Sequence, residues 1–180
     1  MRVPRRFAIV GAALGLGGLS AFAAAPVLAA PSLSVSFYAH GGATAKWVAP
    51  HSAIQLTVPN SSSYAIIVFH HFSPTASMTA PSFTTDTYGS GSPRWYIQFA
   101  GGGYLFGFPS QYPYWNVEGC SDVSGGYPFS YTTALTALQN STSNCGGNVT
   151  GVYIVADSSQ PTPAVDTLTN IQYGGIPVTK

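Results

Sequence analysis

The stretch Trp95–Pro109, WYIQFAGGGYLFGFP, is rich in aromatic residues and glycine and carries no charge. Together with Arg94 it is typical of two strands joined by a glycine turn. Neighbouring side chains of a strand point to opposite faces, so alternation sorts the first strand into two sets. The expected core set is Trp95, Ile97 and Phe99, and the opposite set is Arg94, Tyr96 and Gln98. We therefore predict a hairpin with one buried face and one face of mixed polar and aromatic character.

The second strand of this hairpin has large side chains on both of its faces. The expected sets are Tyr104, Phe106 and Phe108 on one face and Leu105 and Gly107 on the other. One sheet face cannot bury all of these rings unless the hairpin lies centrally in a sandwich. We expect some of the rings to belong to the core and the others to be exposed.

Similar runs of Val, Ile, Tyr and Phe, separated by Gly, Pro, Asn and Ser, recur along the chain. The predicted strands lie at 33–40, 53–59, 64–72, 94–100, 104–108, 151–157 and 168–175. Short strands at close spacing predict an all-β fold, an antiparallel β-sandwich of the jelly-roll type. At most one short helix is expected, at 131–140, where no strong capping residue is recognised. Segments 73–93 and 108–131 are expected to be long loops, where binding sites are usually built.

The N-terminal sequence MRVPRRFAIVGAALGLGGLSAFAAAPVLAA has the basic start, apolar run and small-residue end of a secretory signal. We expect residues 1–29 to be a signal peptide, cut after Ala29. Residues 30–180 are expected to form a single β-sandwich domain. An uncleaved membrane anchor is the alternative interpretation. Cleavage predicts an extracellular or cell-surface protein.

Charge excludes several classes of partner. Without residues 1–29, three basic and five acidic side chains remain, a net charge of −2. Binding to nucleic acid depends on clustered Lys and Arg, and these three cations are far apart in the sequence. The same lack of clustered Lys and Arg argues against binding to a membrane surface through a polybasic segment. We expect no nucleic-acid partner and no stable membrane insertion after cleavage.

The chain has two cysteines, Cys120 and Cys145. An even pair in an exported protein is typical of a disulfide. Neither cysteine lies in a CxxC motif or beside a histidine, which disfavours a metal site. We predict a Cys120–Cys145 disulfide that stabilises the fold by about 3 kcal/mol.

Several side chains of the hairpin and of the following SQYPYWNVEG segment combine aromatic rings with hydrogen-bonding groups. This combination suits a sugar, because a ring packs on the C–H face of a pyranose while polar groups bind its hydroxyls. The candidate glycan-binding residues are Arg94, Tyr96, Gln98, Tyr112, Tyr114, Trp115 and Asn116. The alternative is that these rings occupy half-buried strand positions.

No catalytic residue, metal ligand or cofactor is assigned. A glycoside hydrolase needs two carboxylates across one cleft. Glu118 and Asp122 lie close in sequence, with Asp86 in the other long loop, but acids so spaced are more often turn residues. The GxSxG elbow of serine hydrolases is absent. His70 and His71 would point to opposite faces of a strand and could not share a metal ion.

The C-terminal stretch 148–175, NVTGVYIVADSSQPTPAVDTLTNIQYGG, resembles the last two strands of secreted jelly-roll modules of the carbohydrate-binding type. In those modules a buried strand ends in Asp, a variable loop follows, and a D-x-I-like strand closes the sheet. The corresponding residues are Asp157, Asp166 and Ile171. The resemblance covers under a fifth of the chain. It implies a jelly roll, a polysaccharide ligand and a structural calcium ion on oxygen ligands.

These features predict a secreted, non-catalytic β-sandwich module whose partner is a polysaccharide or a cell-surface glycan. One alternative is a structural protein of the cell surface or extracellular matrix that self-associates through sheet edges poor in Lys. Another is an extracellular polysaccharide hydrolase or lyase, whose acid pair only the fold would bring together. The sequence leaves the oligomeric state open.

Overall fold

The computed structural model describes residues 32–48, 52–86, 93–108, 112–123, 125–128, 130–157 and 162–180. All of them belong to one compact unit, Pro31–Lys180. The predicted signal peptide lies outside the described residues.

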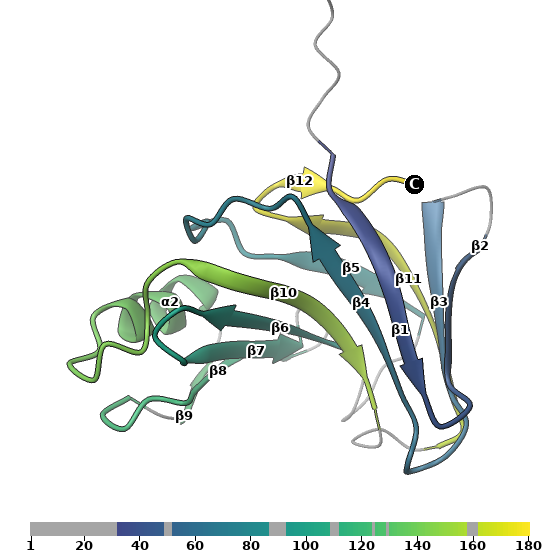
Figure 1. The fold of residues 1–180 in the computed structure, drawn as a ribbon, viewed down its shortest axis with the longest axis horizontal. Helices are drawn as coiled ribbons and strands as arrows, with labels where there is room; N and C mark the ends of the chain where they lie inside the picture. The colour runs from purple at the N-terminus through teal and green to yellow at the C-terminus, as the bar shows by residue number, and fades with distance from the viewer. Residues whose placement is uncertain are drawn as a thin grey trace, which may run out of the picture. The chain divides into compact units, whose positions relative to one another are not determined.

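Seven strands form one antiparallel sheet (Figure 1). In spatial order they are β1 (Ser34–His40), β4 (Tyr64–His70), β10 (Val149–Ala156), β6 (Arg94–Phe99), β7 (Tyr104–Phe108), β8 (Tyr112–Glu118) and β9 (Gly125–Pro128). The predicted hairpin is β6–β7, in which Tyr96 lies opposite Phe106. It has neighbours on both sides, β10 and β8, so it occupies the interior of the sheet.

A second, smaller antiparallel sheet packs on one face of the first. Its strands are β12 (Ile176–Pro177), β11 (Ala164–Tyr173), β3 (Ala53–Val58) and β2 (Thr44–Val48) in that order, and β5 (Ser82–Thr85) also pairs with β11. The predicted all-β, antiparallel sandwich is thus confirmed.

The core lies between the inner faces of the two sheets. The larger sheet contributes Ile67, Trp95, Ile97 and Ile154, and the smaller one Ile54, Leu56, Val58 and Leu168, each with a relative exposure of 0%. Trp95 contacts the rings of Phe69, Phe83 and Tyr173. The predicted core face of β6 is confirmed, and Phe99 is also buried.

One helix, α2 (Tyr131–Gln139), lies where a short helix was predicted. Its N-cap is Ser130, whose Oγ accepts a hydrogen bond from the Thr133 backbone N–H at 2.9 Å. The sequence interpretation had recognised no such cap. Leu135 and Leu138 are buried, and the helix packs on β7, β8 and β9. Among the described residues, no helix reaches the length and apolarity that a membrane span requires.

The long loops expected at 73–93 and 108–131 contain strands. The first includes β5, and the second includes β8 and β9. Within β8 the alternation is clear, because Trp115 and Val117 are buried while Asn116 and Glu118 lie on the other side. Pro and Gly around these residues are turn signals in a sequence, and they hid the alternation.

The predicted disulfide is confirmed. Cys120, just after β8, is bonded to Cys145, just before β10, with a Cα–Cα distance of 5.6 Å. The β6–β7 turn packs on the same segment, because Gly101 N donates to Gly146 O at 2.8 Å and Gly103 N donates to Cys145 O at 2.9 Å. A Cβ on Gly101 would lie 2.0 Å from Asn144 O, so this close approach requires glycine.

Candidate functional site

The outer face of the seven-stranded sheet, which the second sheet does not cover, carries a row of aromatic side chains. Residues paired directly across antiparallel strands share a face. Tyr153 of β10 pairs with Tyr96 of β6, and Tyr96 pairs with Phe106 of β7. Val68 of β4 and Asn116 of β8 continue this row at its two ends. The row therefore crosses five strands on one face.

Two tyrosines of this face form a stacked pair. The ring centroids of Tyr96 and Tyr104 are 4.6 Å apart with an interplanar angle of 29°. In the register of β6 on β7 the two residues are diagonal neighbours, since Tyr96 lies opposite Phe106 and Tyr104 lies opposite Gln98, so their rings lean toward one another across the two strands. Tyr153 and Phe106 flank the pair, at 6.3 Å from Tyr96 and 6.4 Å from Tyr104.

The ring of Tyr153 lies differently, along its own strand. A Cβ placed on Gly151 would lie 2.5 Å from the Tyr153 hydroxyl oxygen and 2.6 Å from its Cε2. The ring thus covers the position where residue 151 would carry a side chain. Because glycine leaves that position empty, the ring can lie flat on the sheet with its other side facing outward. Sequence reasoning missed Tyr153, although the alternation in GVYIVAD gives it the same face as Val155.

The charged groups of this face are paired with one another or with a phenol. Arg94 donates two hydrogen bonds to Asp157, Nη1 to Oδ1 at 3.0 Å and Nη2 to Oδ2 at 2.5 Å. The Tyr104 hydroxyl donates to Glu118 Oε2, and this hydrogen bond is the main cause that raises the pKa of Tyr104 to about 12. At neutral pH the charges of Arg94 and Asp157 therefore offset each other, while Glu118 keeps its negative charge because the Tyr104 phenol that donates to it is neutral.

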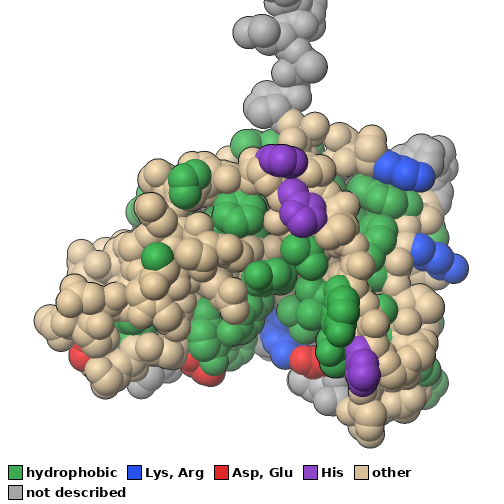
Figure 2. Space-filling view, viewed as in Figure 1, with side chains coloured by type: hydrophobic (Ala, Val, Ile, Leu, Met, Phe, Trp, Pro, Cys, Tyr) green, Lys and Arg blue, Asp and Glu red, His purple; other side chains and the backbone are tan. Residues whose placement is uncertain are grey.

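Figure 2 shows that the lower side of the molecule is hollowed. Hydrophobic side chains lie on both sides of the hollow, and a Lys or Arg side chain lies beside an Asp or Glu side chain between them. An ion pair of this kind joins Arg94 and Asp157. In Figure 1, β6, β7 and β10 lie on one side of this region, and β1 and β4 lie on the other.

The structure brings five of the predicted ligand residues together on this face. Arg94, Tyr96 and Gln98 lie along β6, and Asn116 lies on β8. Tyr114 lies two residues before Asn116 on β8, so it is on the same face, and it is 42% exposed. The seventh predicted residue, Tyr112, begins β8, and its side chain lies outside the described part of the structure.

The predicted position of Trp115 is wrong. It was expected in an exposed loop, but it lies on the inner face of β8 with a relative exposure of 3%. Its ring meets the ring of Tyr131 of α2 edge-on at 4.8 Å. A Cβ on Gly107, its partner in β7, would lie 2.6 Å from the indole. Trp115 therefore packs between the sheet and α2 and is not displayed on the outer face.

The acids considered for catalysis have separate hydrogen-bonding roles. Glu118 accepts from Tyr104, and Asp86 Oδ1 accepts from the Thr167 backbone N–H of β11 at 2.7 Å. Asp122 binds the segment that follows α2. Its donors are Ser141 Oγ and Ser143 Oγ at 2.6 Å, Thr142 N at 2.6 Å and Thr142 Oγ1 at 2.7 Å. Hydrogen bonds from these hydroxyls lower the pKa of Asp122 below its usual 3.8.

We expect Asp122→Asn to lower stability in a pH-dependent way. The pKa of Asp122 is lower in the folded chain than in the unfolded chain, so its carboxylate stabilises the fold above pH 3.8 and this contribution is lost as pH falls below that value. Urea unfolding of both proteins from neutral to acidic pH measures the effect. The difference in midpoint should be largest at neutral pH and shrink in acid. A difference that stays constant with pH would contradict this role.

The structural calcium that the resemblance implies needs several oxygen ligands around one point. Asp157 is bound to Arg94, and Asp166 is fully buried on β11. Within the described ranges, no three His, Cys, Asp or Glu side chains gather as metal ligands would.

A groove of about 460 Å³ lies elsewhere, between α2 and the segment that precedes β5. Met78, Leu135, Gln139, Asn140 and Asn148 are among its lining residues. Its lining contains neither an aromatic ring nor a charged side chain. The outer face of the seven-stranded sheet has more of the groups that sugar recognition uses.

Comparison with protein-family models, with curated proteins and with solved structures found no significant match to this chain.

Proposed function

We propose that this protein is a secreted, non-catalytic module that binds a polysaccharide or a cell-surface glycan on the outer face of its seven-stranded sheet. The observation that carries the proposal is the row Tyr153, Tyr96 and Phe106, which crosses neighbouring strands on one face. Hydrogen-bonding side chains flank this row, Gln98 on β6 and Asn116 on β8.

The arrangement suits a sugar in two ways. The outward side of the Tyr153 ring provides a flat apolar surface for the C–H face of a pyranose, and amide groups beside it can bind hydroxyls. The Tyr96–Tyr104 stack holds its rings in place before a ligand arrives, which reduces the entropy that binding would cost.

Two further features support an extracellular role. The disulfide Cys120–Cys145 is typical of proteins that fold in an oxidising compartment. The N-terminal sequence predicts export by a signal peptide. A soluble module outside the cell would meet polysaccharides directly.

The test compares Tyr153→Ala with Gly151→Ala. The first removes the flat ring, while the second keeps every candidate group and only displaces that ring, because the new methyl would overlap its hydroxyl end. We expect both variants to bind insoluble cellulose, chitin or xylan about tenfold more weakly than the wild-type chain, the equivalent of about 1.4 kcal/mol. Depletion binding assays measure this, and thermal unfolding checks that the variants remain folded.

Matched controls lie on the outer face of the smaller sheet. Gln55→Ala on β3 removes an amide from that face, and Val165→Ala on β11 removes an exposed apolar group. Neither control should change binding. Equal binding by wild type, Tyr153→Ala and Gly151→Ala would refute the proposed site. Concentration-dependent oligomers that form without sugar and vanish in Tyr153→Ala would favour a self-associating structural protein instead.

A further inference from the structure

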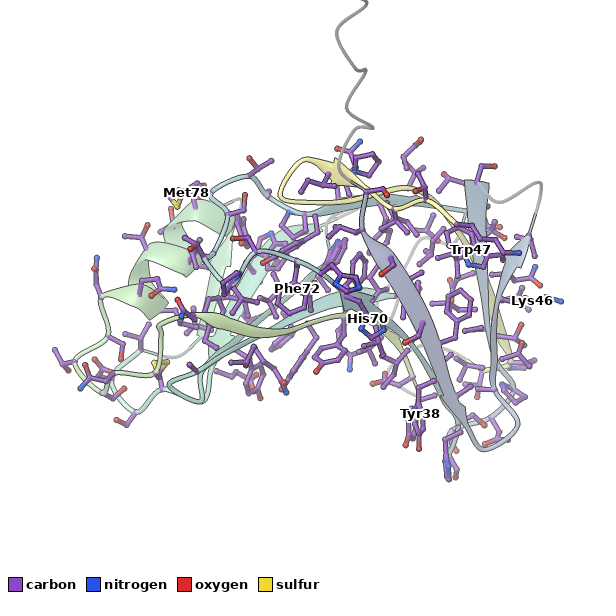
Figure 3. The ribbon with its side chains drawn as sticks, turned by 45° about the horizontal axis from the view of Figure 1, so that its top comes forward. Tyr38, Lys46, Trp47, His70, Phe72 and Met78 are labelled. Carbon is purple, nitrogen blue, oxygen red and sulfur yellow. A yellow bond between two sulfur atoms is a disulfide. The ribbon has the colours of Figure 1, made fainter. Side chains whose placement is uncertain are left out.

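A second group of rings lies on the same outer face, on β1 and β4. Tyr38 and His40 of β1 flank Tyr64 of β4, with ring centroids 5.9 Å and 5.2 Å from it. Tyr38 is 53% exposed, and in Figure 3 it projects from β1 away from Trp47. A hydrogen bond with Tyr38 is the largest cause that raises the pKa of Tyr64 above 10.0. We call these three residues the Tyr38 group.

The strand register places the Tyr38 group and the Tyr153–Tyr96 row on one continuous face. Tyr38 pairs with Ile66 of β4, Ile66 pairs with Val155 of β10, and Val155 pairs with Arg94 of β6. Ile66 and Val155 are half-buried, so they form an apolar floor between the two groups of rings. Tyr153 lies in line with Ser36 through Val68, so Tyr38 and Tyr153 are separated by two strand spacings, about 10 Å, and by two residues, about 7 Å, along the strands.

The charges on this floor favour an uncharged ligand. Arg94 and Asp157 form a bidentate ion pair there, with side-chain exposures of 20% and 26%. Their charges cancel at short range, while their remaining lone pairs and N–H groups can still bind hydroxyls. A polyanion or polycation would gain no net attraction from this pair.

We propose that the Tyr38 group is a second subsite and that the ligand is an extended, uncharged glycan chain long enough to contact both groups of rings. This inference rests on the proposed function and adds the length and charge of the ligand. A monosaccharide or disaccharide would occupy one group of rings and leave the other empty. A longer chain would contact both, with the Arg94–Asp157 pair beneath its middle.

The experiment measures the affinity of two variants for a neutral polymer and for its disaccharide. The first pair of probes is soluble xylan and xylobiose, and the second is hydroxyethylcellulose and cellobiose. Tyr38→Ala removes an exposed ring of the Tyr38 group, and Tyr153→Ala removes the flat ring of the other group. For the polymer we expect each substitution to weaken binding by about three- to tenfold. We expect only Tyr153→Ala to weaken binding of the disaccharide. Val165→Ala is the control for both probes, and thermal unfolding confirms that all variants are folded.

Two outcomes separate the inference from the function on which it rests. If the wild-type chain binds the polymer and Tyr153→Ala weakens binding while Tyr38→Ala does not, the second subsite is refuted and the proposed function stands. If the wild-type chain binds neither these probes nor insoluble cellulose, chitin or xylan, the proposed function fails and the inference fails with it. Tighter binding to carboxymethylcellulose than to hydroxyethylcellulose would refute the preference for an uncharged chain.

Discussion

Trp115→Ala is expected to lower the free energy of unfolding by about 3–5 kcal/mol, the usual loss when a large buried aromatic side chain is truncated. The indole is 3% exposed and packs between Gly107 of β7 and Tyr131 of α2, so its removal leaves a cavity beneath the helix. Urea unfolding followed by circular dichroism measures the change. Binding should weaken only to the extent that the chain unfolds.

The neighbouring residue supplies the control for this prediction. Tyr114 belongs to the same strand but is 42% exposed, and Tyr114→Ala should change stability by about 0.5 kcal/mol or less. A Trp115→Ala variant that is as stable as the wild type yet has lost polysaccharide binding would return Trp115 to the list of ligand contacts.

Removal of the disulfide should also have a large effect. The bond joins residues 25 positions apart, and loop-closure entropy gives about 3.5 kcal/mol for such a loop. The double substitution Cys120→Ala and Cys145→Ala is expected to lower the free energy of unfolding by this amount. The β6–β7 turn should suffer most, because Gly101 and Gly103 bond to the segment around Cys145.

Chemical denaturation with and without reductant tests this second prediction. Reductant should shift the unfolding midpoint of the wild-type chain and leave that of the double variant unchanged. An unchanged wild-type midpoint, with both thiols shown to be reduced by labelling after unfolding, would contradict the stabilising role of the bond.

The sequence was informative wherever the alternation of side chains is uninterrupted. In β6 it separated the core face, with Trp95 and Ile97, from the outer face that carries Tyr96. It also located α2 and the disulfide correctly. These features depend on local patterns or on the number of cysteines, and both can be read without knowing the fold.

The rest of the face depends on contacts between distant segments. Asp157 pairs with Arg94 across 63 positions of the chain, and no local pattern connects them. The partners of Tyr38 are likewise set by the register of β1 on β4 and of β4 on β10. Trp115 was misplaced because Pro113 and the following glycines suggested a loop, although the alternation from Tyr114 to Glu118 was that of a strand.

The internal pairing of charges on the outer face has a consequence for the conditions in which the protein works. Salt weakens attraction between exposed charges over a Debye length of about 8 Å at physiological ionic strength. An uncharged ligand that binds through ring packing and hydroxyl hydrogen bonds has no net charge, so salt has little electrostatic attraction to weaken. We therefore expect glycan binding at the proposed site to change little with salt concentration, because the Arg94–Asp157 pair beneath it already offsets its own charges.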